Sequence, residues 1–195
     1  MPWRGKWATE TGGTSAAHGI HAMDFMLWLL GDWAEVRAMV GTLVHDIEVD
    51  DVSMVSVRFA NGALANITNS AISPREESYL RFDFERATVE LTHLYRYAND
   101  DWRFTMPLPL LDQEALAEWR EIGGVDNPNF HGRQLAAFLD SMDRTERPAA
   151  SGDDIRRTLD VLASLYKSGL TGQPVQRGSI TPTDPFYRHF GGLKQ

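Results

Sequence analysis

Two alternating segments joined by Ala60-Asn61-Gly62 constrain the fold of this chain more than any other feature. In the segment 52–59 every second residue is apolar or small, and the segment 63–70 follows directly after the turn residues. Alternation with a period of two is typical of a strand that buries one face. Asn and Gly accept the positive φ angles of a type I′ turn, so this pair predicts a tight hairpin. The chain should therefore contain an antiparallel sheet.

Further strand patterns lie on both sides of this hairpin. They cover residues 33–43, 79–84 and 88–95, and only three residues separate the last two. Consecutive strands with tight turns predict an antiparallel sheet, and such a sheet often has one covered face.

Helical patterns flank the strand block. A first helix is expected from Thr14 or Ser15 to Leu30, a short one over 112–121, and another over 129–145. Ser151 with an acid three residues later predicts the start of a last long helix, which ends at Gly169 or Gly172. Two apolar stripes are expected to be buried: Leu135, Phe138, Leu139 and Met142, and Ile155, Leu159, Leu162 and Tyr166.

This order of elements predicts an α+β fold. Its sheet should be open and predominantly antiparallel, with helices packed on one face. A length of 195 residues, with 43% hydrophobic and 24% charged residues, fits a single domain over 1–195 with a sizeable core.

Composition and charge argue against several classes of partner. The net charge is −8 and the Lys and Arg residues are scattered, which disfavours nucleic acid and anionic membrane surfaces. The longest apolar stretch, Phe25 to Leu30, is too short to cross a bilayer, and the first residues lack the apolar core of a secretory signal. The chain has no cysteine, so a thiolate metal site is excluded and a cytoplasmic location is expected.

The start of the first helix carries the residues with the most chemical interest. His18, His21 and Asp24 are spaced at i, i+3 and i+6, and His21, Asp24 and Trp28 fall on one helical stripe. Three interpretations are open. The residues bind a metal ion; His21 is a catalytic base that Asp24 orients; or the histidines are core residues that bond backbone carbonyl groups.

Other polar groups are weaker candidates. Glu48, Asp50 and Asp51 form an acidic cluster that reads as a solvated loop rather than as a carboxylate pair. The polar segment 66–70 ends a strand and either lines a site or faces water. The sequence has no G-x-G-x-x-G fingerprint, no Walker loop and no nucleophile elbow.

Five segments carry a resemblance to a known family. In order they read WRGKWATETGGTSAAHGIHAMDFMLWLLGDWAEVRA, IEVDDVSMVSVRFANGALANI, HGRQLAAFLDSM, RPAASGDDIRRTLDVLASLYKSGLTGQPV and DPFY. They resemble the C-terminal, substrate-side domain of the glucose–fructose oxidoreductase/inositol dehydrogenase/MocA (Gfo/Idh/MocA) family, from Trp3 to about Tyr187. Members of that family are similar in having an N-terminal Rossmann domain with a Glu-Lys-Pro motif, and we expect this chain to lack it.

The resemblance implies roles for individual residues. His21 would contact a substrate hydroxyl and assist proton transfer while hydride moves to C4 of the nicotinamide. The family often has Asp or Asn four residues before this histidine, where this chain has Ala17. Either His18 or the lysine of the absent motif would then compensate. The resemblance also places Trp3, Arg4 and Lys6 near the domain junction, where they would contact substrate or cofactor.

The function implied is that of a substrate-binding and oligomerisation domain of an NAD(P)-dependent oxidoreductase. Its substrate would be a sugar, a cyclitol or a related polyol, and NAD or NADP would be bound mainly by the absent domain. The isolated chain should therefore bind no cofactor and be inactive, and should self-associate through its sheet face into a dimer or larger oligomer. The alternative is a stand-alone, non-catalytic binding or dimerisation module.

Overall fold

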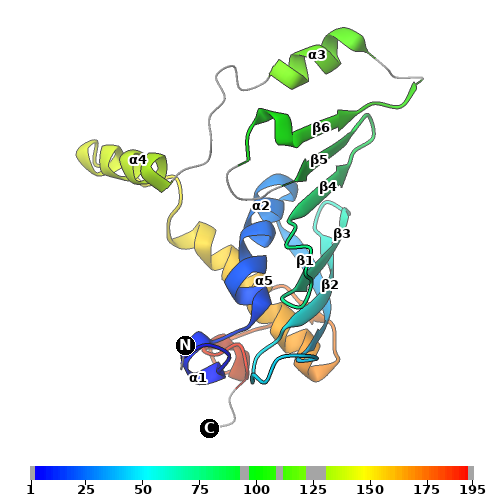
Figure 1. The fold of residues 1–195 in the computed structure, drawn as a ribbon. Coiled ribbons are helices and arrows are strands. Elements are labelled where there is room, and N and C mark those ends of the chain that lie inside the picture. Colours follow the sequence, from blue (N-terminus) through cyan, green and yellow to red (C-terminus); the bar gives the residue numbers. More distant parts are fainter. Residues whose placement is uncertain (1–2, 93–96, 109–111, 122–130, 193–195) are drawn as a thin grey trace. The chain divides into compact units, whose positions relative to one another are not determined.

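The computed structural model describes residues 3–92, 97–108, 112–121 and 131–192 (Figure 1). The chain divides into two compact units, Met1–Pro74 with Ala150–Gln195, and Arg75–Ala149. Helices accompany two antiparallel sheets, which confirms the predicted α+β class.

The first unit contains a four-stranded sheet in the order β3-β2-β1-β7. Its strands are β1 (Trp33–Gly41), β2 (Val52–Phe59), β3 (Leu64–Ser70) and β7 (Val175–Gln176), and every neighbouring pair is antiparallel. The first three confirm the sequence prediction. The two residues of β7 were not predicted, because a strand this short has no periodicity to detect.

The β2–β3 hairpin has a different turn from the predicted one. Gly62 takes a φ of 92°, but Asn61 is not among the described non-glycine residues with positive φ. The N–H of Gly62 bonds the carbonyl of Phe59 at 3.1 Å and so closes a turn before the glycine. The type I′ prediction is therefore wrong, because that turn needs positive φ at two successive residues. The side-chain amide of Asn61 instead donates to the carbonyl of Leu30 at 3.0 Å.

The first predicted helix forms with an unexpected start. Ser15–Gly19 makes a π-helix, and α2 continues over Ile20–Leu30 to Gly31, which has a φ of 85°. The short α1 precedes it over Trp7–Glu10. The last helix, α5, spans Gly152–Thr171 and ends on left-handed Gly172, as predicted. A 3-10 turn over Pro185–Tyr187 follows near the end of the chain.

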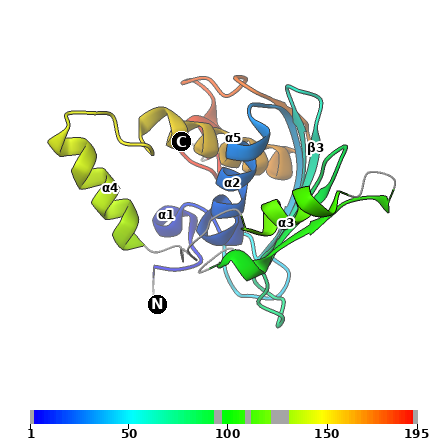
Figure 2. The same cartoon turned by 90° about the horizontal axis from the view of Figure 1, so that it is seen from above.

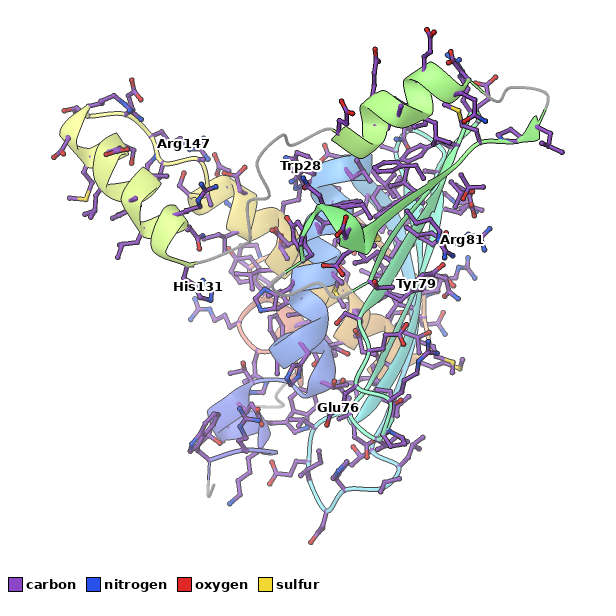
Figure 3. The ribbon with its side chains drawn as sticks, turned by 45° about the horizontal axis from the view of Figure 1, so that its top comes forward. Trp28, Glu76, Tyr79, Arg81, His131 and Arg147 are labelled. Atoms are coloured by element: carbon purple, nitrogen blue, oxygen red, sulfur yellow. The ribbon has the colours of Figure 1, made fainter. Side chains whose placement is uncertain are left out.

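The core lies between the four-stranded sheet and helices α2 and α5, which lie on the same side of the sheet (Figure 2). The helices contribute Met23, Met26, Leu27, Val161, Leu162, Leu165 and Tyr166, and the sheet contributes Trp33, Val36, Val55, Val57 and Phe59. The sequence of α2 is apolar nearly all round, which predicts burial on more than one side, but Trp28 on this helix is 71% exposed (Figure 3). Ile155 and Leu159 are also exposed, so only the later part of the predicted α5 stripe is buried.

The second unit contains a three-stranded sheet in the order β4-β5-β6. Its elements are β4 (Tyr79–Asp83), β5 (Thr88–Thr92), a 3-10 turn (Asn99–Asp101), β6 (Trp102–Thr105), α3 (Gln113–Glu121) and α4 (His131–Asp143). The indole of Trp119 on α3 contacts the ring of Phe104 on β6, with centroids 6.0 Å apart.

The predicted apolar stripe of α4 is exposed in this chain, contrary to expectation. A helix shows such a face when nothing in the described residues covers it. The ends predicted at Tyr95 for β5 and at Asn129 for α4 lie outside the described residues. Within the described ranges, none of the helices combines the length and apolar character needed to cross a lipid bilayer.

Candidate functional site

The carboxylates of Asp50 and Asp51 are buried, although the sequence predicted that they lie in a solvated loop. Asp50 is 4% exposed and Asp51 is 0% exposed, so the prediction of a solvated acidic cluster is wrong for both. Glu48 alone of the three is exposed. A buried carboxylate is tolerated only where hydrogen-bond donors surround it. The donors to Asp50 come from distant segments, which is why the local composition did not reveal its burial, whereas those to Asp51 come from residues 43–45 of the same loop.

Asp50 holds the segment that leads into the histidine-bearing helix. Its Oδ1 accepts from the hydroxyl of Tyr166 at 2.7 Å and from the N–H of Gly13 at 2.9 Å. Its Oδ2 accepts from both the N–H and the hydroxyl of Ser15, at 3.0 and 2.7 Å. The backbone carbonyl of Asp50 also accepts from the N–H of Thr14 at 3.0 Å. Both carboxylate oxygens thus fix the entry to the π-helix.

The polar chain continues from Asp50 to strand β3. The hydroxyl of Ser15 lies 2.8 Å from that of Ser53 on β2, and the side-chain amide of Asn69 donates to Ser53 at 3.0 Å. Asn69 is half-buried, whereas Asn66, Thr68 and Ser70 are exposed. Both predicted alternatives for the polar end of β3 are therefore found. The side chain of Asn69 joins the interior network, and the other three side chains face water.

Two glycines permit these close approaches. A Cβ atom on Gly13 would lie 1.9 Å from the backbone oxygen of Asp50. A Cβ atom on Gly19 would lie 2.5 Å from Oδ1 of Asn69. Contacts this short are repulsive, so glycine at these two positions lets the backbone of residues 13–19 pass close to Asp50 and Asn69.

The π-helix and the first turn of α2 present both histidines. His18 lies within Ser15–Gly19, His21 is the second residue of α2, and both side chains are exposed. The structure therefore places neither imidazole in the core, which removes the core interpretation. Exposed imidazoles at the start of a helix are accessible to a small molecule.

Asp24 is tied to a neighbouring helix. Its Oδ1 accepts from the hydroxyl of Thr158 on α5 at 2.6 Å. Within the described part of the chain, no three His, Cys, Asp or Glu side chains are grouped so as to hold a metal ion. The metal interpretation of His18, His21 and Asp24 therefore has no support from the geometry.

The remaining predicted residues lie on the N-terminal arm. Trp3, Arg4 and Lys6 are exposed, and the guanidinium of Arg4 stands 5.2 Å from the ring centroid of Trp3. The arm is fixed to the loop between β1 and β2, because the carbonyl of Gly5 accepts from the N–H of Glu48 at 2.7 Å. These contacts bring Trp3 and Arg4 together and leave all three side chains accessible.

Sequence reasoning missed Ser15, Asp50 and Tyr166 as members of a site. Tyr166 was expected in the core and lies there, but its hydroxyl belongs to the polar network. Burial, together with the Asp50 carboxylate, raises the pKa of the Tyr166 phenol, so the hydroxyl keeps its proton. A tyrosine on the buried stripe of a helix was the available signal, since a buried hydroxyl needs a partner.

The described residues do not fit a dinucleotide by themselves. Both sheets are antiparallel, so the described part of the chain forms no parallel strand–helix–strand unit to cradle a pyrophosphate.

The face of the four-stranded sheet that points away from the helices has its own character. Arg37, Met39, Met54, Arg58 and Leu64 are exposed there, and Glu35 is half-buried. A groove of about 430 Å³ lies between Glu35, Arg58 and Leu64. The carboxylate of Glu35 forms an ion pair with the guanidinium of Arg37 at 2.7 Å. The large apolar side chains of Met39, Met54 and Leu64 would be buried only if a second surface covered this face.

Comparison with known proteins identifies what this chain is similar to. Residues 1–93 match the family model described as the GFO/IDH/MocA C-terminal domain. A D-apiose dehydrogenase from Rhizobium rhizogenes is 23% identical over 170 residues, which cover 83% of this chain and 48% of that protein. The chain thus spans about half the length of the curated relative that it matches.

Solved structures show the same fold. The WlbA dehydrogenase from Bordetella pertussis, in complex with NADH and UDP-GlcNAcA, superposes with a TM-score of 0.69 at 23% identity, covering 90% of this chain and 48% of that one. An aldose-aldose oxidoreductase from Caulobacter crescentus, complexed with glycerol, gives a TM-score of 0.70 at 22% identity, covering 89% of this chain and 50% of that one. At these identities the likeness shows the fold.

Proposed function

Given that residues 1–93 belong to the GFO/IDH/MocA C-terminal domain family, we propose that this chain is the substrate-side domain of an oxidoreductase that acts on a sugar, a cyclitol or a related polyol. It works with a dinucleotide-binding domain that lies outside these 195 residues. That domain supplies the NAD or NADP chemistry, and the isolated chain binds no dinucleotide and turns over no substrate.

The observation that carries this proposal is the pair of exposed imidazoles at the start of α2. His21 stands in the first turn of the helix and His18 in the π-helix before it, and a buried network anchors the segment from behind. His21 binds the hydroxyl of the substrate and, as a general base, takes its proton as the carbon is oxidised. His18 supplies a second polar contact near Ala17.

The N-terminal arm completes the substrate site. Trp3, Arg4 and Lys6 are exposed on one short segment, and they offer an aromatic surface and two cations. A polyol presents both C–H faces and hydroxyl groups, and these residue types bind such a ligand by stacking and by hydrogen bonds. Asp24 positions the helix through Thr158.

Enzyme assays on two proteins test this function. One is the isolated chain, and the other joins residues 1–195 to an upstream dinucleotide-binding domain. Each is incubated with NAD⁺ or NADP⁺ and with D-apiose, UDP-GlcNAcA or glycerol, and nicotinamide reduction is followed by absorbance. We expect turnover by the joined protein with at least one probe and none by the isolated chain. A joined protein that binds NADH and yet reduces neither nucleotide would support a non-catalytic binding module instead.

Self-association through the exposed sheet face belongs to the same proposal. Met39, Met54 and Leu64 lie beside charges of both signs, and an isologous contact could pair Glu35 of one copy with Arg58 of the other. Burial of this face in a dimer removes its large apolar side chains from water.

Sedimentation of the purified chain tests the interface. The wild type should sediment as a dimer or a larger oligomer, and Leu64→Lys should shift it to the monomer. Leu43→Lys is the matched control, because Leu43 is 68% and Leu64 is 69% exposed, but Leu43 lies in a loop. A wild-type monomer at all concentrations, or equal effects of both substitutions, would contradict the interface.

A further inference from the structure

The entry to the histidine-bearing segment is held by one side chain. Four donors from Gly13, Ser15 and Tyr166 converge on the carboxylate of Asp50, at 2.7 to 3.0 Å. Three of these donors belong to residues 13–15, which lead directly into the π-helix. Asp50 itself precedes β2, so the four-stranded sheet and the histidine segment meet at this carboxylate.

We propose that Asp50 is a positioning residue, whose carboxylate fixes the turn over residues 13–19 and thereby sets where the imidazoles of His18 and His21 stand. Its importance for catalysis rests on the proposed function of His21, but its effect on the position of the imidazoles does not. Asp50 lies among buried groups and acts only through the backbone that it binds.

A π-helix needs such an anchor. Its hydrogen bonds are less favourable than those of an α-helix, and single π turns persist where the surrounding structure holds them. Asp50 accepts hydrogen bonds from the start of this turn, and the side chain of Asn69 packs closely against Gly19 at its end. With both ends fixed, the phase of α2 is set, and so is the direction in which His21 leaves the helix.

The contacts also require a carboxylate at this position. Every group bound to Oδ1 and Oδ2 is a donor. In Asp50→Asn the amide nitrogen would face an N–H or O–H group and leave at least one buried donor without an acceptor. Because the shape of the side chain is almost unchanged, this substitution tests the charge and the acceptors rather than the packing.

The matched control lies next to it. Asp51 is equally buried and its carboxylate also accepts three backbone N–H bonds, but they come from Leu43, Val44 and His45 in another loop. Asp51→Asn should therefore perturb the fold by a similar loss while leaving the histidine segment in place.

The experiment compares wild type, Asp50→Asn and Asp51→Asn in the purified 195-residue chain. NMR records the imidazole Cε1–H signals of His18 and His21 through a pH titration, and amide exchange is measured residue by residue. In Asp50→Asn we expect exchange at residues 13–19 to be faster by about tenfold or more, and both imidazole signals to move. In Asp51→Asn the faster amides should be those of residues 43–45, with the imidazole signals at their wild-type positions.

Imidazole signals that stay unchanged in Asp50→Asn, or that move equally in Asp51→Asn, would overturn the proposal. If Asp50→Asn does not fold, Ser15→Ala replaces it, because this variant removes one donor to Oδ2 and keeps the backbone. Ser15→Ala should move the same signals, and unchanged signals in this variant would likewise refute positioning by Asp50. None of these measurements uses a substrate. Unchanged imidazole signals would therefore refute positioning by Asp50 without bearing on the proposed function, and an inactive joined protein would refute the proposed function without bearing on Asp50.

Discussion

The hydroxyl of Tyr166 donates a hydrogen bond of 2.7 Å to the carboxylate of Asp50, which lies 116 positions earlier in the chain. This contact joins α5 to the segment before β2 in the interior of the first unit. Residues so far apart in the sequence can form this hydrogen bond only once α5 has packed against the four-stranded sheet. The bond is therefore a test of the packed state rather than of any single element.

Tyr166→Phe removes this donor and keeps the ring. We expect the free energy of unfolding to fall by about 1–3 kcal/mol, because a bond to a buried carboxylate is lost while the acceptor stays buried. Denaturation with urea measures the change. Tyr187→Phe is the control at an exposed tyrosine, and it should change stability by less than about 0.5 kcal/mol. Equal losses in the two variants would show that the bond contributes nothing.

Gly13→Ala tests the close approach of the backbone to Asp50. The added Cβ would lie 1.9 Å from the Asp50 backbone oxygen, so the two segments must separate. We expect a loss of about 3 kcal/mol in the free energy of unfolding, measured by thermal and urea denaturation. Gly152→Ala is the matched control, since a Cβ there meets nothing within 4 Å. A tolerated Gly13→Ala would contradict the described path of the chain.

The bond between Asp24 and Thr158 predicts coupled stabilities. Asp24→Ala and Thr158→Ala should each destabilise the fold, and the double variant should lose less than the sum of the two, by about 1 kcal/mol. A double-mutant cycle in urea measures this coupling. Additive losses would show that Asp24 and Thr158 act independently.

The lowered pKa of Asp51 predicts that the free energy of unfolding falls in acid. Burial raises its pKa, but N–H bonds from His45, Leu43 and Val44 outweigh burial and hold the pKa of the carboxyl well below the ordinary 3.8. Because the folded pKa is the lower one, the stabilisation is complete above about pH 3.8 and is lost as the pH falls below that value. The stability difference between wild type and Asp51→Asn should therefore shrink below about pH 3.8. A difference that is constant from about pH 7 to about pH 3 would contradict this account.

The elements that could be predicted are those set by local patterns. The alternation in β2, the turn residues before β3 and the cap at Ser151 act within a few residues, so each was found from the sequence. The accessible position of His18 and His21 did not follow from local residues, because their spacing alone left a core position open.

The features that could not be predicted depend on distant contacts. The π-helix forms where Asp50 and Asn69 confine residues 13–19, and neither anchor is near in sequence. The burial of Asp50 and Asp51 was hidden because three acidic residues in a short segment usually face water. The donors to Asp50 lie in segments that only the tertiary fold brings together, and those to Asp51 depend on how the loop over residues 43–51 folds back on itself.

The catalytic role of His21 is tested most directly by His21→Ala in the protein that joins this chain to a dinucleotide-binding domain. We predict that kcat falls by about 10²–10⁴-fold, the contribution of a positioned general base. The free energy of unfolding should change by less than about 0.5 kcal/mol, because the side chain is exposed. A kcat within about twofold of the wild-type value would show that His21 takes no part in the reaction.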